Sequence, residues 1–344
     1  MPWQEEDEDE DGEERVSSHT DPVDAPAGPA GKGELAPLYR PCASAYCRPM
    51  PELPEVETVR RALERHVTGR TVRTVWLSGL ALRKPVPAAL ARRAPGRTIL
   101  AVRRHGKFLL VDFDGGARIV AHLGMTGHFR FHLSDPGPPR SLVAHTHAVL
   151  RFADGSALAY EDPRRFGMLD WAEPGVPDSV ALGPTGAGLD PMVERMDGTR
   201  LGSLFARCRG PIKHLLLDQK RIAGIGNIYA SEALFRAGIG PRRLVHTLSA
   251  AERERLAREI HSVLDSAVEN RGTTLSDFRD LDERPGSYGE SLLVYDREGE
   301  PCVTCGAAIR RIVQTGRSTF FCGTCQRKAG AGRPLGSKVR ATAR

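Results

Sequence analysis

The sequence predicts an α+β protein with three folded parts: a leading helix with an antiparallel β-sandwich, a helical region, and a C-terminal four-cysteine β-hairpin. Three observations lead to this prediction. Short β-rich runs follow one another from residue 71 to residue 171, helical periodicity covers most of 199–270, and two Cys-x2-Cys pairs lie within 302–325. Strands at this density without helices between them favour a sandwich or barrel.

The leading helix is expected within residues 50–69. Pro54 suits the first helical position, Glu55 and Glu57 suit the positive end of the helix dipole, and Gly69 suits the C-terminal stop. Apolar residues recur at three- and four-residue steps from Val56 to Val67, so the helix has one apolar face.

Seven strands are expected in the N-terminal domain, which we bound at 50–182. Their ranges are 71–77, 98–104, 107–113, 117–123, 127–133, 147–152 and 156–160. A Pro- and Gly-rich linker, 183–198, follows. The next domain, 199–290, is expected to hold helices at 199–208, 211–219, 228–237 and 249–270.

Charge is distributed unevenly along the chain. Lys and Arg number 49 against 43 Asp and Glu, but residues 1–49 hold twelve acids and four bases. Residues 50–344 therefore carry a net charge of +14, which favours polyanion partners such as nucleic acid. We expect residues 1–49 to be a disordered acidic extension and residues 329–344 a disordered basic tail.

Composition excludes several classes of protein. No apolar run approaches the roughly 20 residues of a membrane span, and the acidic N-terminus has no apolar signal region. Seven cysteines in 344 residues do not make a disulfide scaffold. We expect a soluble, intracellular protein with no membrane partner.

The cysteine-rich segment, 291–328, predicts a metal site. The pairs Cys302–Cys305 and Cys322–Cys325 are separated by sixteen residues, which fits one Zn²⁺ held by four thiolates. Closed coordination leaves no position for water, so the metal is expected to be structural. A pair of disulfides is the alternative.

A Gly-x-Gly-Asn turn precedes the third helix of the helical region. Gly224 and Gly226 allow a tight bend, and the N–H groups at the following helix start can hold a phosphate. An ordinary helical hairpin explains the turn equally well. Lys213, Lys220 and Arg221 lie close in sequence and favour the phosphate interpretation.

Six motifs in order resemble those of the formamidopyrimidine-DNA glycosylases of base-excision repair. They are MPELPEVE at 50–57, RRHGKFLL at 103–110, HLGMTG at 122–127, YEDPRRFG at 160–167, GIGNIYASEALFRAGI at 224–239 and the four-cysteine finger. The resemblance covers about residues 50–326. It implies an N-terminal β-sandwich, a helix–two-turns–helix DNA-binding domain and a zinc finger.

The resemblance also implies an activity. Members of the family remove oxidised purines, mainly 8-oxoguanine and formamidopyrimidines, from duplex DNA and cut the strand by β,δ-elimination. We therefore expect a bifunctional DNA glycosylase/AP lyase that acts as a monomer in the cytoplasm, associated with the nucleoid. Two alternatives stay open: an endonuclease VIII-like enzyme for oxidised pyrimidines, and a non-catalytic zinc-finger DNA-binding protein.

Catalytic roles follow from the resemblance residue by residue. Pro51 is implied as the nucleophile, whose secondary amine forms a Schiff base with the sugar, and Glu52 as the general acid/base. Lys107 is implied as a phosphate contact and the proton donor of β-elimination. Arg317 is implied as the proton donor of δ-elimination and a phosphate ligand.

DNA-binding roles are implied in the same way. Met125, Arg164 and Phe166 match the positions that fill the hole left by the everted base, and His145 matches a further DNA contact. Lys213 and Asn227 are expected on phosphates that flank the lesion. The chain departs from the family at Ser276, within the predicted base-covering loop 272–290, and at Cys208, where basic residues are common.

The nitrogen of Pro51 presents a chemical conflict. Within a peptide bond it is a tertiary amide that carries no hydrogen, so it cannot form an iminium. We expect translation to begin at Met50, with Met50 then removed. Cleavage of the extension after synthesis, or a full-length chain that binds DNA without this catalysis, are the alternatives.

Overall fold

The computed structural model describes residues 50–137, 144–273, 281 and 284–326. The predicted acidic extension, the basic tail and Ser276 lie outside the described residues. Among the described residues, no helix is long and apolar enough to cross a membrane.

The leading helix, α1, spans Leu53–Val67. Glu52 is its N-cap residue, which puts Pro54 at the second helical position and not the first, where the sequence had suggested it. The helix ends at Val67 with Thr68 as its C-cap residue, and Gly69 follows with φ of +81°. The predicted stop is therefore confirmed, because a left-handed conformation suits glycine.

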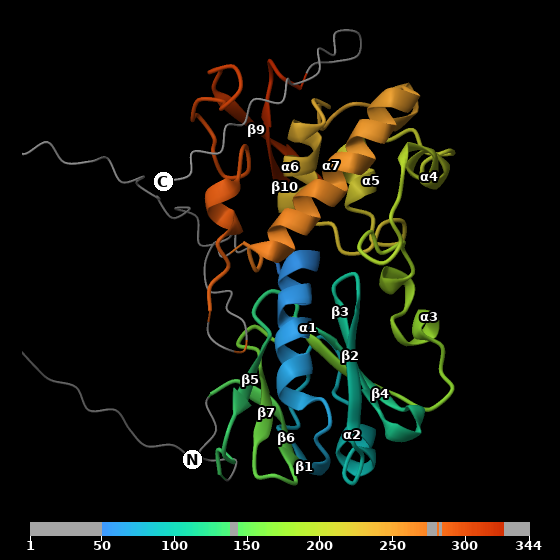
Figure 1. Cartoon of the computed structure of the whole chain (residues 1–344), viewed down its shortest axis with the longest axis vertical. Coiled ribbons are helices and arrows are strands. Elements are labelled where there is room, and N and C mark those ends of the chain that lie inside the picture. The colour runs from blue at the N-terminus through green and yellow to red at the C-terminus, as the bar shows by residue number, and fades with distance from the viewer. Residues whose placement is uncertain (1–49, 138–143, 274–280, 282–283, 327–344) are drawn as a thin grey trace, which may run out of the picture. The chain divides into compact units, whose positions relative to one another are not determined.

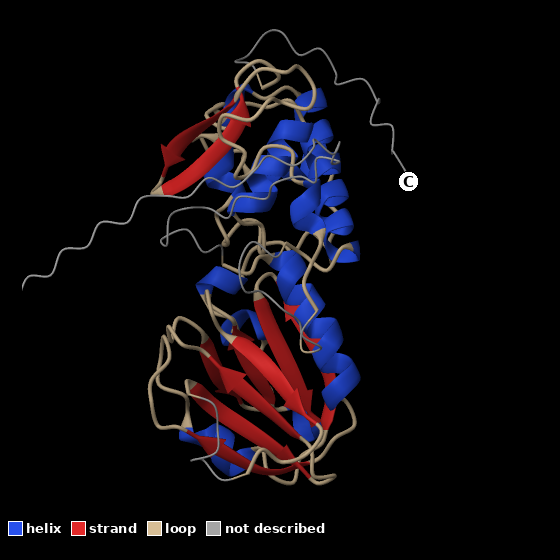
Figure 2. Ribbon diagram, turned by 90° about the vertical axis from the view of Figure 1, so that its left-hand side faces the viewer, coloured by secondary structure: helices blue, strands red, loops and turns tan. Residues whose placement is uncertain are grey.

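The N-terminal domain is built on two four-stranded antiparallel sheets (Figure 2). One sheet has the order β1 (Val72–Leu77), β6 (Thr146–Phe152), β7 (Ala157–Glu161) and β5 (His128–His132). The other has the order β2 (Ile99–His105), β3 (Phe108–Phe113), β4 (Arg118–His122) and β8 (Met168–Ala172). Buried side chains from both sheets and from α1 form one hydrophobic core, so the predicted sandwich is confirmed.

Two elements of this domain were not predicted. Helix α2 (Ala88–Arg93) interrupts the run of strands between β1 and β2, and β8 pairs with β4 at the edge of its sheet. The linker adds a single helical turn, α3 (Asp178–Ala181). Short 3-10 turns lie at Asp114–Gly116, Pro184–Gly186, Val245–Thr247 and Tyr288–Ser291.

The helical region holds the four predicted helices (Figure 1). They are α4 (Gly198–Leu204), α5 (Ile212–Leu216), α6 (Asn227–Arg236) and α7 (Ala250–Glu269). The first two are shorter than predicted. Helix α7 begins where Ser249 and Glu252 form a reciprocal capping box, in which each side chain accepts from the other's backbone N–H.

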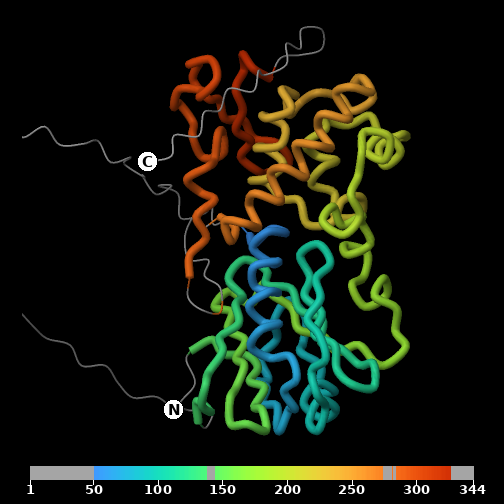
Figure 3. Tube along the Cα trace, in the orientation of Figure 1, coloured from blue at the N-terminus to red at the C-terminus, as the bar shows by residue number. Residues whose placement is uncertain are grey.

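The C-terminal hairpin pairs β9 (Ile309–Gln314) with β10 (Arg317–Cys322). Thr315 and Gly316 both adopt positive φ in the turn. Residues 284–308 lead into this hairpin and are drawn in orange to red in Figure 3. Ile309 and Phe320 belong to the same hydrophobic core as these helices, so hairpin and helices pack as one body.

Candidate functional site

Glu52 joins the N-terminal domain to the helical region. Its Oε1 accepts a hydrogen bond from the Ile228 N–H at 3.0 Å and its Oε2 accepts one from the Tyr229 N–H at 3.4 Å. These amides belong to the first turn of α6, where unpaired N–H groups and the helix dipole stabilise an anion. The carboxyl group is 3% exposed, so the helix start holds it in a fixed, nearly dry position.

The two glycines of the Gly-x-Gly-Asn turn make this approach possible. A Cβ atom at Gly226 would lie 2.1 Å from Cδ of Glu52, and one at Gly224 would lie 2.6 Å from Cδ1 of Leu53. The Ile228 and Tyr229 amides hold the carboxyl group of the protein's own Glu52. These two groups are therefore not open to the phosphate that one of the two interpretations predicted.

A second buried carboxyl, Glu55, lies against Glu52. The Glu52 N–H donates to Oε2 of Glu55 at 2.9 Å, the Thr273 N–H donates to Oε1 at 2.7 Å, and the Tyr229 hydroxyl donates to Oε1 as well. Burial, followed by the charge of Glu52, raises the pKa of Glu55 to about 7. Burial also raises the pKa of Glu52, against the lowering effects of Lys107 and the α6 amides.

Three predicted cations from separate segments act electrostatically on this acidic pair or on one another. Burial lowers the pKa of Lys107, Glu52 raises it and Arg317 lowers it further. Burial likewise lowers the pKa of Lys213 to about 7, with an opposing effect of Glu52 and a further lowering by Arg317. Lys107 and Lys213 are thus within electrostatic range of Glu52, and Arg317 is within electrostatic range of both lysines.

The turn that carries Lys107 is tied to the linker. Asp190 is 1% exposed, and its Oδ2 accepts from the Gly106 N–H at 2.7 Å and from Nη1 of Arg104 at 2.5 Å. Arg104 also donates from Nε to Glu57 of α1 at 3.1 Å. Asp190 and Arg104 were not singled out in the sequence, because no local spacing pairs an acid at 190 with a turn at 106.

Met125, Arg164 and Phe166 lie on two turns that pack against each other. The Thr126 hydroxyl donates to Asp162, and a Cβ atom at Gly124 would lie 2.4 Å from the backbone of Phe166. The Arg164 guanidinium lies 4.7 Å from the centroid of the Phe166 ring, and the Phe166 side chain is 44% exposed.

His145 is exposed beside these turns, with φ of +71°, and its carbonyl accepts from the Asp162 N–H at 3.0 Å. The structure thus brings together the four residues that the resemblance assigned to the lesion and its surroundings. Asp162 and Thr126, which hold the two turns together, were not singled out.

Asn227 and Lys213 both contact the hairpin strand β10. Nδ2 of Asn227 donates to the Ser318 carbonyl at 2.9 Å, and Nζ of Lys213 donates to the Thr319 hydroxyl at 2.8 Å. Cys208 is partly buried against the core of the helical region. The adjacent Arg207 and Arg209 are both exposed.

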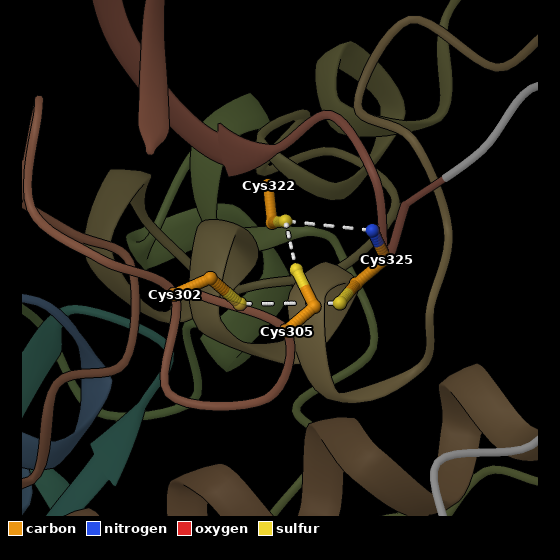
Figure 4. A group of neighbouring side chains, drawn as sticks. All are labelled: Cys302, Cys305, Cys322 and Cys325. Atoms are coloured by element: carbon orange, nitrogen blue, oxygen red, sulfur yellow. Dashed lines mark hydrogen bonds between the residues drawn. The ribbon is translucent and has the colours of Figure 1, made fainter. Parts of the chain in front are cut away.

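The four predicted metal-ligating cysteines converge at the base of the hairpin (Figure 4). Their sulfur atoms all lie within 4.8 Å of one another, with Sγ–Sγ distances of 3.9 Å for Cys302–Cys325 and 3.5 Å for Cys305–Cys322. A tetrahedral zinc–thiolate site, with Zn–S near 2.3 Å, requires sulfurs about 3.8 Å apart. The four thiols therefore fit a structural metal ion.

Three family models match the chain in succession. They are the formamidopyrimidine-DNA glycosylase N-terminal domain at residues 50–169, the H2TH domain of the same glycosylases at 187–279, and the zinc finger found in FPG and IleRS at 299–327. A formamidopyrimidine-DNA glycosylase of Gluconobacter oxydans is 44% identical over 280 residues, which are 81% of this chain and 100% of that protein. The chain belongs to the formamidopyrimidine-DNA glycosylase family. A further relative of that name, from Methylococcus capsulatus, is 45% identical and is also covered in full.

Solved structures of other family members have the same fold. The MutM (Fpg) protein of Thermus thermophilus has a TM-score of 0.70 and 43% identity over 80% of this chain and 98% of its own. The Lactococcus lactis Fpg in complex with abasic-site DNA has a TM-score of 0.71 and 31% identity over 80% of this chain and 100% of its own. The wild-type Lactococcus protein has also been solved with DNA containing N7-benzyl-Fapy-dG.

These findings confirm the predicted family, the fold class and the assignment as a DNA glycosylase of DNA repair. The alternative of a non-catalytic DNA-binding protein is not supported. The curated relatives are covered over their full length, so this family member contains every domain that they contain.

Proposed function

We propose that this glycosylase excises oxidised purines, namely 8-oxoguanine and formamidopyrimidines, from duplex DNA and then cleaves the strand as an AP lyase. One observation carries the proposal. Glu52, directly after Pro51, is fixed on the first turn of α6 within electrostatic range of Lys107 and Lys213. The names of the relatives, and the abasic and Fapy-dG lesions in the solved complexes, support this choice of substrate.

The first step uses the pair Pro51 and Glu52. The lone pair of the Pro51 amine attacks C1′ of the damaged nucleotide, an N–C1′ bond forms, and the glycosidic bond breaks as the base leaves with a proton. A free α-amine has a pKa near about 8, so part of it is neutral at physiological pH. The C1′–O4′ bond then breaks, the nitrogen lone pair forms the C1′ iminium, and O4′ takes a proton; the raised pKa of Glu52 suits the group that holds this proton.

The second step is elimination from the resulting iminium. The C1′ iminium accepts the electron pair released when a C2′ proton leaves, and the 3′ phosphate departs; the 5′ phosphate departs in the δ step. We assign Lys107 and Arg317 as proton donors in these two steps. Lys213 and Asn227 are assigned to the flanking phosphates, where a fixed ammonium group and an amide donor stabilise the departing charge.

The two packed turns that carry Met125, Arg164 and Phe166 are assigned to fill the space that the everted base leaves in the duplex. An exposed Phe166 ring with the Arg164 guanidinium beside it provides an apolar wedge and a planar donor set, and Met125 adds a flexible apolar side chain. Everting a base leaves its partner unpaired, and such side chains stabilise that state. His145 is assigned to DNA contact at the same turns.

The metal is proposed to be one structural Zn²⁺ on Cys302, Cys305, Cys322 and Cys325. It takes no part in the chemistry and holds the base of the hairpin that carries Arg317. The proposed partner is damaged double-stranded DNA, bound by a monomer.

The proposed chemistry requires Pro51 to be a free N-terminus. We therefore propose that the active protein begins at Pro51 after removal of Met50 and everything that precedes it. Pro51 is partly exposed in the structure, and the Leu53 N–H donates to the Gly224 carbonyl at 3.0 Å. This hydrogen bond anchors the backbone that follows Pro51, so in the proposed processed protein the Pro51 amine is held beside Glu52.

Borohydride trapping tests the proposal. A protein that begins at Pro51, mixed with duplex containing 8-oxoguanine opposite cytosine, is expected to form a reduced covalent adduct and to release the base. The Pro51→Gly variant is expected to form far less adduct, and the 344-residue chain none. Failure of the Pro51 form to be trapped would overturn the Schiff base, and preference for thymine glycol would favour the pyrimidine enzyme.

A further inference from the structure

Strand β10 makes two hydrogen bonds to side chains of the helical region. Nζ of Lys213 in α5 donates to Oγ1 of Thr319 at 2.8 Å, across 106 positions of sequence. Nδ2 of Asn227 at the start of α6 donates to the main-chain carbonyl of Ser318 at 2.9 Å, across 91 positions. Two adjacent residues of one strand thus hold side chains from two different helices.

The Lys213 contact is deeply buried. Lys213 is 1% exposed and Thr319 is fully buried. An ammonium group needs partners when it leaves water, and among the described residues the Thr319 hydroxyl is its hydrogen-bond acceptor. Without that hydroxyl the Lys213 side chain has no fixed hydrogen-bonded position, because a lysine stem has four rotatable bonds.

The Asn227 contact has a different dependence on sequence. Its nearer acceptor is a main-chain carbonyl, so this contact depends on the path of β10 and not on the Ser318 side chain. A second, longer contact joins Nδ2 to the Tyr295 hydroxyl at 3.5 Å. Oδ1 of Asn227 is buried without a partner among the described residues, and this orphaned acceptor adds nothing to hold the amide elsewhere. The amide is therefore aimed by the strand.

We propose that β10 is a positioning strand: the Thr319 hydroxyl and the Ser318 carbonyl orient Lys213 and Asn227 for the DNA backbone. The finger then contributes more than Arg317 to DNA binding, because it also sets the direction of two side chains that belong to other elements. Thr319 is the positioning residue that mutation can address. This inference rests on the proposed contact of Lys213 with a phosphate.

The test compares matched variants of the protein that begins at Pro51. Thr319→Val removes the hydroxyl at nearly constant volume, Thr319→Ser keeps it, and Thr74→Val makes the same change at an exposed position of β1 as the control. Binding is measured on duplex with a tetrahydrofuran abasic analogue over a range of salt concentrations, with zinc content and melting temperature for each variant. Thr319→Ala replaces the Val variant if the latter does not fold.

Thr319→Val is expected to weaken binding by about tenfold, the value of one charged hydrogen bond, and to reduce the salt slope by about one phosphate contact. Thr319→Ser and Thr74→Val are expected to bind like the parent protein. Lys213→Gln is expected to give a similar loss, and adding Thr319→Val to it is expected to cost nothing more.

Two outcomes would overturn the inference. One is unchanged affinity and salt slope in Thr319→Val; the other is additive losses in the double variant, which would make Thr319 a core residue acting independently of Lys213. Failure of the proposed function is distinguishable from both. In that case the parent protein itself neither excises 8-oxoguanine nor binds the abasic duplex, whatever stands at position 319.

Discussion

At the scale of single residues, the site depends on how closely two backbones approach. The Glu52 carboxyl touches the main chain of Gly226, where a Cβ would lie 2.1 Å from Cδ of Glu52. We predict that Gly226→Ala pushes this carboxyl off the α6 amides. Displacement of a catalytic group by about 1 Å can cost on the order of 100-fold in rate, so base excision under single-turnover conditions should fall by about that factor.

Gly210→Ala is the matched control for this prediction. A Cβ there meets nothing within 4 Å, and the backbone of Gly210 has no positive φ. Its excision rate should equal that of the parent protein. An unchanged rate in Gly226→Ala would mean that the contact between Glu52 and the α6 amides is irrelevant to excision.

Glu55 makes the stability of the protein depend on pH. Its pKa is about 7 in the folded protein, above the ordinary value of 4.5, so the folded state binds more protons between these values. Stability from this group is therefore fully present below about pH 4.5 and is lost as pH rises to about 7. Relative to Glu55→Gln, which does not titrate, the parent should lose up to about 3 kcal/mol of unfolding free energy.

Urea unfolding of the parent and of Glu55→Gln at about pH 5 and about pH 7.5 checks this sign. Between the lower and the higher pH, the unfolding free energy of the parent should fall relative to that of Glu55→Gln. Two curves that keep the same separation at both pH values would contradict a raised pKa for Glu55.

Residue-level prediction of proximity succeeded where the motif itself brings the side chains together, whereas the catalytic roles assigned to Pro51 and Glu52 stay predictions. The four cysteines meet because Cys-x2-Cys knuckles form local turns. Pro51 and Glu52 are adjacent in the chain, so their juxtaposition follows from covalent geometry. The partners of Glu55, namely Tyr229 and Thr273, lie 174 and 218 positions away, and no spacing rule connects them to the helix start. Glu55 itself was interpreted only as a dipole residue.

At the scale of elements, α6 holds two other segments of the chain. Its N-terminus holds Glu52, and in its middle the fully buried Glu232 accepts from the N–H groups of Leu293, Val294 and Tyr295, each at 2.9 Å. One carboxylate therefore satisfies three donors of the segment that leads to the finger. This explains how a segment with little regular structure keeps a fixed path.

Glu232→Ala leaves those three amides buried without an acceptor. Each such group costs about 1–3 kcal/mol, so we predict a loss of at least about 3 kcal/mol in unfolding free energy. Denaturant unfolding gives the loss, and limited proteolysis should show new cleavage between the helical region and the finger. Glu269→Ala, an exposed position on α7, is the control and should change stability by less than about 0.5 kcal/mol.

We expect the hairpin β9–β10 to depend on the metal ion proposed at the four cysteines. Cys305 is the exposed ligand, so Cys305→Ser removes one thiolate without opening a cavity in the core. We predict loss of zinc, measured by atomic absorption, and a drop of at least about tenfold in DNA binding, since four-thiolate sites stabilise small folds outright. The far-UV signal of the sandwich should persist. Full DNA affinity in a zinc-free protein would contradict a structural role for the metal.

Element prediction failed at boundaries for physical reasons. Helix α5 ends at Leu216 although helical periodicity continues to residue 219, because Asp218 accepts from the Lys220 N–H and turns the chain. Helix α2 lies in a segment whose single fully buried apolar side chain, Leu90, gives no periodic signal. Strand β8 is defined by its pairing with β4, which the local sequence does not reveal.

At the scale of the whole molecule, two explanations of DNA binding differ in the role they give to charge. Residues 50–344 carry a net charge of +14, and binding could follow either this total or a few placed cations. Lys107, Lys213 and Arg317 interact electrostatically around Glu52 although they come from three segments. The fold therefore brings together cations that lie far apart in the sequence. This favours the explanation in which a few positioned cations contact the phosphates.

Salt dependence decides between the two. Three phosphate contacts give a slope of about −2.7 in a plot of log affinity against log salt, so affinity should fall at least about 40-fold between about 50 and 200 mM salt. Arg317→Gln should reduce the slope by about 0.9. Arg92→Gln, at an exposed position on α2, removes the same charge from the total and should leave the slope unchanged. If both variants reduce the slope equally, net charge governs binding, and the convergence of cations around Glu52 serves the chemistry instead.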